Sequence, residues 1–369
     1  MRLDAITLYD FRNYQHLQLA LVPGVNLLVG ENAQGKTNLL EAVGYLSTGK
    51  SFRTARPQEL VRFGADFTDL NAQIYSQGRE QTLRAVLFAG RRPRQIFIGG
   101  VKQRSAAALE GLLTTVLFCP EELQVLKGGA AARRKLIDTA LCQLRPNYAR
   151  ALAEYTKLLD SKSRILKDYH DAPQMLEPLP EFNYRMAQVG AILIGYRAQY
   201  LKALSEAAGE YHREFSGGGE TLSLSYKTVS TVPAAFAPRQ TVFEQILQHQ
   251  ESHYRAELDS GQCLTGPHKD DFDASINGAS IRAFGSQGQT RTASISLKLA
   301  ERELFRRDTG EEPLLLLDDV LSELDAKRQD FVLNQIRTGQ VLITCCEPEK
   351  LTALGKTILI RAGQVIEQS

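Results

Sequence analysis

The chain has 369 residues, of which 43% are hydrophobic and 23% charged, a composition typical of globular proteins with room for two domains. No apolar stretch is long enough to cross a bilayer, and Met1 is followed by a charged, strand-like segment rather than a leader. The five cysteines show no metal-ligand spacing, so we expect reduced thiols. These features argue against membrane-spanning and disulfide-rich secreted proteins, and they predict a cytoplasmic location.

The charge of the chain is distributed unevenly. The formal net charge is only +2, yet residues 91–170 contain 15 Lys and Arg against 7 Asp and Glu, a local excess of +8 that leaves −6 for the remainder. Such asymmetry indicates either a basic surface for a polyanion or an ordinary solvated helical surface, and composition does not choose between them.

The N-terminal third is predicted to consist mainly of strands. Residues 2–29 show partial alternation and end in the short apolar run "VNLLV", after which a glycine-rich turn leads into a helix over 37–49. Residues 69–103 predict an antiparallel meander, and the turn between its last two strands carries "GRRPR".

The middle of the chain is predicted to be helical. Apolar residues recur at helical spacing over 146–170 and 181–215, and the second helix ends at three consecutive glycines, 217–219. The short link between the helices predicts an antiparallel pair.

Strand patterns return after about residue 258. Residues Asn277-Gly278 favour a two-residue hairpin between "DFDASI" and "ASIRAF". A helix to about 307, the strand "PLLLLDD", another helix, the strand "QVLIT" and a final hairpin are expected to follow.

The segment "GENAQGKT" matches the phosphate-loop pattern G-x-x-x-x-G-K-[ST], between a strand and a helix as that motif requires. Backbone N–H groups and the helix N-terminus favour phosphate, Lys36 is expected to reach the β- and γ-phosphates, and Thr37 to bind Mg²⁺. The predicted ATP-binding residues are Gly30, Glu31, Asn32, Ala33, Gln34, Gly35, Lys36, Thr37 and Asn38.

The run "LLLLDD" predicts a buried strand with carboxylates at its C-terminal edge. A capping aspartate would explain such a run by itself. Beside a phosphate loop we expect Asp318 to bind Mg²⁺ and Asp319 to orient or deprotonate the attacking water. Because the two motifs lie far apart in sequence, we expect a discontinuous ATPase domain (1–118 and 258–369) interrupted by a helical lobe (119–257).

Two short motifs flank the acidic strand. "SELD" follows it, and Ser322 and Asp325 either cap a helix or form a loop near the nucleotide. "SQGQ" precedes it. The order of phosphate loop, insertion, "SQGQ", acidic strand and "SELD" is similar to that of ABC-type ATPases. In that plan Ser286, Gln287, Gly288 and Gln289 serve the γ-phosphate of a nucleotide held by a second subunit.

The whole chain resembles the RecF family of bacterial recombination mediators, whose heads are similar to those of SMC-type proteins. The resemblance is carried by "LYDFRNY", "VGENAQGKTNLLEA", "GKSFRT", "PEELQVLKGGAAARRKLID", "TGPHKDDF", "SQGQTR" and "LLLLDDVLSELD". Ala130 and Leu136 depart from the family pattern, which puts the local loop shape in question. Lys269 stands where the family has an arginine, which removes a bidentate donor. Asp319 replaces the glutamate of ABC transporters, and Thr344 stands near their switch histidine; both changes are RecF-like.

The resemblance implies an α/β fold, an ABC-type (SMC-like) P-loop ATPase head with a mixed sheet and an inserted helical lobe. It implies an ATP- and Mg²⁺-dependent clamp that forms a homodimer on double-stranded or gapped DNA and hydrolyses ATP slowly. Such a protein would help load RecA with RecO and RecR during DNA repair, recombination and replication, in the cytoplasm near the nucleoid.

Several cations are candidates for backbone contacts with DNA: Arg91, Arg92 and Arg94 on the meander, and Arg133, Arg134 and Lys135 after "KGG". Solubilising surface charge is the alternative for each, and pairing with acids of the same lobe is a further one for the second cluster. Arg12 and Asn13 either approach the nucleotide or form a plain hairpin turn. His268, Asp270 and Asp271 form either a metal site or an ordinary turn before a strand.

Three other functions fit parts of the sequence. A transporter ATP-binding subunit would place its acidic strand closer to the phosphate loop. An SMC-like ATPase with nuclease chemistry would need a further acidic constellation. A structural binder with a dead site would not require Lys36, Thr37, Asp318 and Asp319 together.

Overall fold

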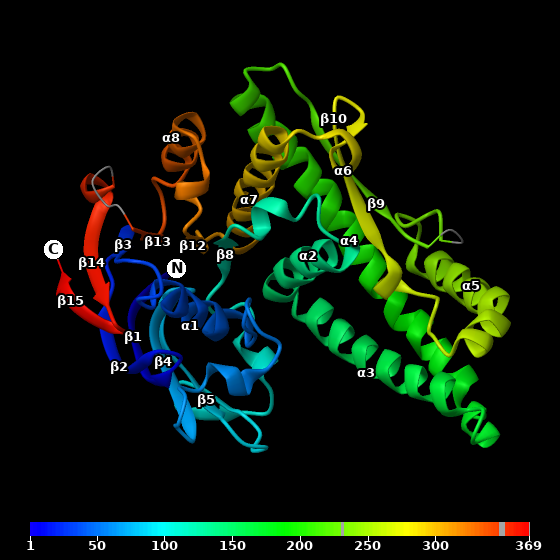
Figure 1. Cartoon of the computed structure of the whole chain (residues 1–369). Coiled ribbons are helices and arrows are strands. Elements are labelled where there is room, and N and C mark those ends of the chain that lie inside the picture. Colours follow the sequence, from blue (N-terminus) through cyan, green and yellow to red (C-terminus); the bar gives the residue numbers. More distant parts are fainter. Residues whose placement is uncertain (230–231, 347–350, 369) are drawn as a thin grey trace. The chain divides into compact units, whose positions relative to one another are not determined.

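The computed structural model describes residues 1–229, 232–346 and 351–368. The chain forms two compact units, one made of Met1–Gln124 with Arg291–Ser369 and the other of Val125–Thr290 (Figure 1). The second unit extends beyond the insertion expected at 119–257, because strand β10 (Asp271–Ile276) pairs with β9 (Leu222–Lys227) inside it.

The first unit contains a mixed sheet and an antiparallel sheet. The mixed sheet has the order β15-β14-β3-β13-β12-β8. Its parallel strands β3 (Val25–Val29), β12 (Leu314–Asp318) and β13 (Val341–Cys345) are almost entirely buried, as their continuous apolar runs predict. Strands β8 (Thr115–Phe118), β14 (Gly355–Arg361) and β15 (Gln364–Gln368) complete this sheet.

The antiparallel sheet has the order β2-β1-β4-β5-β6-β7. It confirms the predicted meander, and its strands are β1 (Arg2–Phe11), β2 (Tyr14–Ala20), β4 (Phe67–Ser76), β5 (Arg79–Phe88), β6 (Gln95–Ile98) and β7 (Val101–Gln103).

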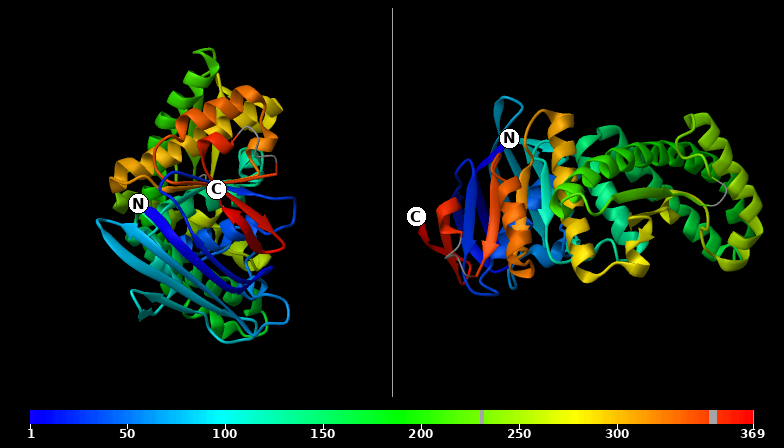
Figure 2. Two further views of the ribbon diagram at one scale, coloured as in Figure 1. Left: turned by 90° about the vertical axis from the view of Figure 1, so that its left-hand side faces the viewer. Right: turned by 90° about the horizontal axis from the view of Figure 1, so that it is seen from above.

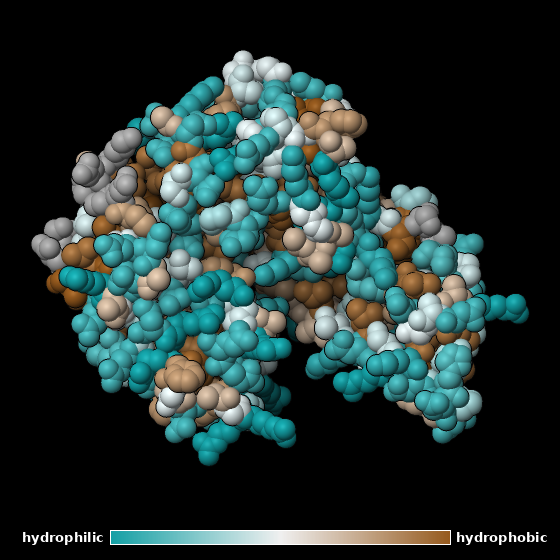
Figure 3. All heavy atoms as spheres, in the orientation of Figure 1, coloured by the Kyte–Doolittle hydropathy of each residue, from teal (hydrophilic) through white to brown (hydrophobic). Residues whose placement is uncertain are grey.

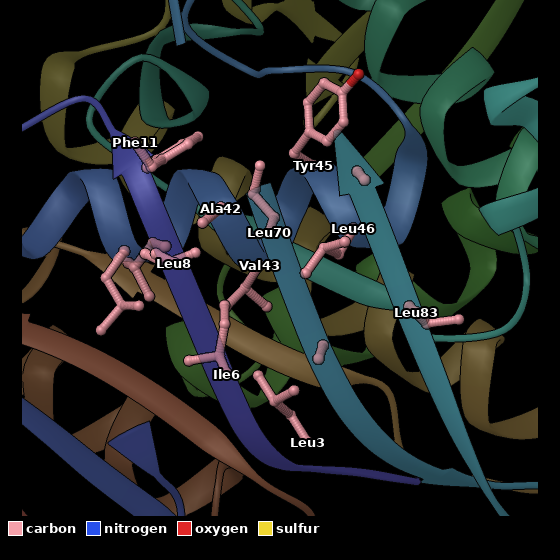
Figure 4. Packing of buried hydrophobic residues seen from close by; sticks show 14 of the residues in the cluster. Leu3, Ile6, Leu8, Phe11, Ala42, Val43, Tyr45, Leu46, Leu70 and Leu83 are labelled. Atoms are coloured by element: carbon pink, nitrogen blue, oxygen red, sulfur yellow. The ribbon is translucent and has the colours of Figure 1, made fainter. Parts of the chain in front are cut away.

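Helix α1 (Lys36–Thr48) shares one hydrophobic core with both sheets of this unit. Figure 4 shows α1 running behind β1, β4 and β5, with side chains such as Val43, Leu46, Ile6 and Leu70 packed between them. The helix ends where Gly49 adopts φ 67° and its N–H donates to the Tyr45 carbonyl. Because α1 starts at the phosphate loop, this core fixes the direction of the loop.

The helices α7 (Gln287–Thr309) and α8 (Ala326–Gln335) follow the "SQGQ" and "SELD" motifs. Hydrophilic side chains cover most of the face seen in Figure 3. No helix among the described residues combines the length and the apolar character that crossing a membrane requires.

The second unit is built on α2 (Ala130–Leu144), α3 (Pro146–Asp168), α4 (Leu179–Ser216) and α5 (Arg239–Ser260). The expected pair 146–170 and 181–215 is confirmed as α3 and α4, and α4 ends at Gly217 with φ 64°. Strands β9 and β10 run beside α4 (Figure 2), and apolar residues of α4 and α5 form a separate core.

One predicted strand is wrong. Asn277 and Gly278 form the expected hairpin turn, both with positive φ, but β11 covers only Ala279–Ser280. The chain then forms the helical turn α6 (Ile281–Phe284), closed by the Gly285 N–H to the Ile281 carbonyl. Two residues of pairing do not outweigh this local turn, so "ASIRAF" is mostly helical.

Candidate functional site

The phosphate loop lies between β3 and α1, and two of its glycines are required by space. A Cβ on Gly30 would lie 2.3 Å from the Ile360 carbonyl oxygen, and a Cβ on Gly35 would lie 2.7 Å from Asn13 Nδ2. Gly35 also has φ 115°, and Ala33 has φ 63° although it carries a side chain. The loop therefore has the tight curvature that turns successive N–H groups toward one point.

Lys36 is buried, with 7% of its surface exposed. Its ammonium donates to the carbonyls of Gly30 and Glu31, the latter at 2.8 Å, and lies 3.5 Å from Cys346 Sγ. The loop thus holds the positive charge at its own centre. Phosphate oxygens are stronger acceptors than these carbonyls. Hydrogen bonds from Lys36 to a bound triphosphate can therefore replace its hydrogen bonds to the loop.

The contact between Thr37 and Asp318 joins the two halves of the motif set. Thr37 Oγ1 donates to Asp318 Oδ1 at 2.8 Å, across 281 positions of sequence. Thr344 Oγ1 donates to the same carboxylate oxygen at 3.0 Å. A hydroxyl and a carboxylate side by side are the oxygen donors that Mg²⁺ prefers, so these residues fit the metal.

Burial raises the pKa of Asp318, and the neighbouring Asp319 raises it further. Hydrogen bonds from Thr37 and Thr344 and the charge of Arg53 oppose that shift. A divalent cation at this carboxylate would favour the ionised form strongly and so oppose the effect of burial.

Asp319 lies just beyond the end of β12 in a strained backbone conformation, with φ 51°. Its N–H donates to Thr344 Oγ1 at 2.8 Å. Thr344 therefore contacts both members of the acidic pair, a role that its sequence position near a switch histidine did not reveal.

Asn13 hydrogen-bonds to the phosphate loop, whereas Arg12 pairs with Glu41 beside the loop. Asn13 Nδ2 donates to the Gln34 carbonyl at 3.0 Å and its Oδ1 accepts from Asn38 at 2.8 Å. Arg12, with φ 52°, donates twice to the fully buried Glu41, at 2.9 and 2.8 Å. The "FRNY" turn thus supports the loop.

Arg53 is a residue to which the sequence assigned no role. It belongs to "GKSFRT", and its Nη1 donates to Asn38 Oδ1 at 2.7 Å and contacts Glu41 at 3.4 Å. It is close enough to Asp318 to lower the pKa of that carboxyl. The motif in which it stands was the only signal that the sequence offered.

The "SQGQ" segment belongs to the second unit and forms the start of α7. Ser286 Oγ accepts from the Gln289 N–H, and Gln289 Oε1 accepts from the Ser286 N–H, both at 3.1 Å. This reciprocal pair is a capping box, which orders the helix N-terminus without covering the exposed Ser286 hydroxyl. The sequence carries this signal as S-x-x-Q.

Ser322 and Asp325 lie near the acidic strand in the first unit. Ser322 Oγ donates to the Asp319 carbonyl at 2.7 Å, and Asp325 accepts from the Arg328 N–H at 3.0 Å. Asp325 rather than Ser322 is therefore the cap of α8.

The six candidate DNA-binding cations have different environments. Arg91 and Arg92 are exposed, and Arg92 lies over the Phe88 ring. Arg94 donates to the Gly49 carbonyl at 2.8 Å and to the Tyr45 hydroxyl at 3.1 Å.

The second cluster requires a correction. Arg133 is 2% exposed and pairs with both oxygens of Asp271, at 2.7 and 2.9 Å, so it stabilises its own unit and is not an available surface cation. Arg134 donates to the Asp270 carbonyl at 2.6 Å, while Lys135 is exposed.

The metal alternative for His268, Asp270 and Asp271 does not hold. His268 contacts the Tyr155 hydroxyl and the Cys263 carbonyl, and Asp270 accepts from the Tyr226 hydroxyl beside Arg197. Among the described residues, no cluster of His, Cys, Asp and Glu is arranged to hold a metal. These side chains form a structural network in which Asp270 is buried and His268 and Asp271 are partly exposed.

Comparison with known proteins gives one consistent result. The model of the RecF/RecN/SMC N-terminal domain matches residues 2–366. The DNA replication and repair protein RecF of Symbiobacterium thermophilum is 38% identical, covering 99% of this chain and 98% of that protein. The corresponding protein of Acetivibrio thermocellus is 35% identical, with 95% and 94% covered.

Solved structures agree. The recombination mediator protein RecF-ATP of the RecFOR pathway has a TM-score of 0.92 at 32% identity, covering 100% of this chain and 97% of that one. An Smc head domain from Pyrococcus furiosus has a TM-score of 0.56 at 14% identity, a likeness of fold alone. The expected fold, an ABC-type (SMC-like) ATPase head with a mixed sheet and a helical lobe, is confirmed, and the chain belongs to the RecF family.

Proposed function

We propose that this protein is an ATP-dependent recombination mediator. In this proposal it binds duplex and gapped DNA, pairs with a second copy in an ATP-dependent manner, and acts with RecO and RecR to load RecA. The observation that carries the ATP-binding part is the Thr37–Asp318 contact, which joins the phosphate loop to the acidic strand. The names of the relatives support the pathway.

In the proposed mechanism the phosphate loop and Lys36 bind the triphosphate, and Thr37 and Asp318 hold Mg²⁺. The metal would neutralise charge on the β- and γ-phosphates. Asp319, aligned through Thr344, orients the attacking water. Its side chain is shorter than a glutamate, so it reaches that water less well and turnover is slow.

The proposed clamp cycle follows from where the "SQGQ" segment stands. The segment formed by Ser286, Gln287, Gly288 and Gln289 presents its serine, its glycine amide and the helix N-terminus to the γ-phosphate of the nucleotide held by the second copy. Loss of that phosphate removes the contact, so the ATP state favours the dimer and the product state favours monomers. The shift is limited by the difference in contacts between the two states.

Sedimentation of the protein with and without ATP, Mg²⁺ and duplex DNA tests this function. We expect monomers without nucleotide, dimers with ATP and Mg²⁺, and DNA that co-sediments preferentially with the dimer. A protein that stays monomeric at micromolar concentration with saturating ATP and DNA contradicts the clamp.

A groove of the first unit supports a proposed DNA surface. Arg92, Arg94, Lys102 and Arg104 line it, and Phe88 forms part of its wall. Residues 81–109 contain six Lys and Arg and no acidic residue. A groove lined by cations of one charge sign suits the phosphodiester backbone of DNA.

A matched pair of double variants tests this surface. Lys102→Ala with Arg104→Ala should weaken duplex binding and reduce the slope of log K against log salt by about 0.9 for each phosphate that is no longer neutralised. Arg239→Ala with Arg255→Ala removes two exposed cations of α5 and should leave the slope unchanged. Equal slopes for both double variants would remove the groove from the proposal.

A further inference from the structure

We propose that Glu220 is a positioning residue for the "SQGQ" segment: it fixes the amide of Gln289 and thereby the presentation of Ser286 to the nucleotide of a second copy. This inference rests on the proposed function. Glu220 lies outside every recognised motif, in the turn after the three glycines that end α4. Glu220, Ser286 and Gln289 all belong to the second unit.

Two hydrogen bonds connect Glu220 with the backbone of Ser286. Glu220 Oε1 accepts from Gln289 Nε2 at 2.8 Å, and Gln289 Oε1 accepts from the Ser286 N–H at 3.1 Å. The N–H of Gln289 in turn donates to Ser286 Oγ at 3.1 Å. The serine is therefore held through both its amide and its hydroxyl oxygen.

The chemistry of a carboxylate decides which way the Gln289 amide points. An ionised carboxylate only accepts hydrogen bonds, so Gln289 must turn its NH₂ group toward Glu220 and its carbonyl toward the Ser286 N–H. The hydrogen bond from Gln289 is the largest cause of the lowered pKa of Glu220, so the charged form persists. The reversed amide would place two acceptors together at Glu220 and two donors together at Ser286.

Glu220 is itself held from behind. Its Oε2 contacts Nε2 of His212, a fully buried residue of α4, at 3.0 Å, and its N–H donates to Ser216 Oγ at 3.2 Å. A carboxylate fixed at both oxygens loses less conformational entropy for each contact than a free side chain. The end of α4 thus provides a rigid base for the capping box.

The arrangement leaves the reactive face of the segment free. Ser286 Oγ uses a lone pair to accept from Gln289, so its own proton is available to a phosphate oxygen. Ser286 is exposed, whereas Glu220 is only partly exposed and reaches it through Gln289. Glu220 consequently acts on nucleotide contact through positioning and touches no phosphate.

The test is a double-mutant cycle on dimerisation in the presence of ATPγS. Glu220→Ala and Gln289→Ala should each weaken the dimer by about tenfold or more, the scale of a charge-assisted hydrogen bond that occurs twice in each dimer. The double variant should be no weaker than the worse single variant. Glu220→Gln, which keeps an acceptor oxygen, should give an intermediate loss.

Two controls separate positioning from loss of structure. Glu206→Ala removes the same charge from an exposed site of α4 and should dimerise like the wild type. Monomer affinity for ATP should stay within error of wild type in Glu220→Ala. Because this variant also removes a partner of the buried His212, dimerisation is measured well below its thermal midpoint. Amide hydrogen exchange should accelerate over residues 286–290 in Glu220→Ala and in Gln289→Ala, and should be unchanged in Glu206→Ala.

The outcomes distinguish the inference from the proposed function. If the wild type dimerises and the Glu220→Ala effect is absent or simply adds to that of Gln289→Ala, the positioning role is overturned while the clamp stands. If the wild type does not dimerise with ATPγS, the clamp fails and this inference fails with it. Unchanged hydrogen exchange over 286–290 also overturns the positioning role.

Discussion

The phosphate loop and the "SQGQ" segment both open a helix, but their polar groups are satisfied in opposite ways. In the phosphate loop, Lys36 donates to carbonyls of the loop itself, and Thr37 donates to Asp318. A nucleotide with its cation must replace these contacts. In the "SQGQ" segment the contacts come from behind, through Gln289 and Glu220, and nothing in them must break when a phosphate arrives.

This difference indicates a division of labour. A loop whose cation exchanges partners can bind a nucleotide alone, because Lys36 supplies the charge that a triphosphate needs. The "SQGQ" segment supplies neutral donors in a fixed shape, which add to an existing complex but do not create one. The first region should therefore determine affinity for ATP, and the second should determine assembly.

The largest expected effect concerns Lys36. Lys36→Ala should weaken ATP binding by about 100-fold or more, since it removes a charged partner of the triphosphate. Lys202→Ala, at an exposed lysine of α4, is the control and should bind normally. Equilibrium dialysis with labelled ATP measures the affinity of both variants. Normal binding by Lys36→Ala would contradict the claim that the phosphate loop determines affinity for ATP.

Ser286→Arg should abolish ATP-dependent dimers while the monomer still binds ATP with wild-type affinity. The added side chain fills the place of the phosphate and leaves the phosphate loop intact. Light scattering with ATP, beside Ser260→Arg as a surface control, measures the effect. Dimers of normal stability in Ser286→Arg would contradict a role of this segment in assembly.

Asp319→Asn should slow hydrolysis by about 10- to 100-fold, the usual range for loss of a group that orients or accepts a proton. Binding of ATP should be unaffected, so dimers should accumulate and persist. Single-turnover hydrolysis and sedimentation of the same sample give both quantities. Hydrolysis at the wild-type rate would assign the water to another residue.

The smallest expected effect is a pH dependence. Burial raises the pKa of Asp318, so this carboxylate takes up a proton at higher pH than an exposed aspartate as the solution is acidified. The protonated acid is a poor ligand for Mg²⁺. The gain in ATP affinity from Mg²⁺ should thus decline on acidification before exposed aspartates titrate, and Asp318→Asn should show no such gain. A gain that is constant down to the pKa of free aspartate would contradict the raised pKa of Asp318.

Local motifs made much of the first unit predictable. The residues of the phosphate loop from Gly30 to Thr37 have fixed spacing, and the apolar run before Asp318 identifies a buried strand. The strands of the meander alternate clearly, so their order and pairing were also expected. The structure adds the Thr344 contacts and the Arg53 position, which depend on residues far apart in sequence.

The second unit was less predictable for a physical reason. The segments that became α2 and α5 have weak apolar periodicity, and the sequence identified neither as a helix. Arg133 appeared to be a surface cation because its partner, Asp271, is 138 positions away. Glu220 carries no local signal either, since its role depends on a pairing with Gln289 across 69 positions.

The central claim is that the "SQGQ" segment meets the nucleotide of another copy. Photo-cross-linking with a γ-phosphate-linked ATP analogue tests it directly, using unlabelled wild-type chains mixed with an excess of isotopically heavy Lys36→Ala chains. The heavy chains bind nucleotide about 100-fold more weakly. At an analogue concentration that loads only the wild-type chains, we predict that the heavy peptide containing residues 285–291 is labelled. Label confined to the light chains, at any excess of the heavy ones, would contradict the account.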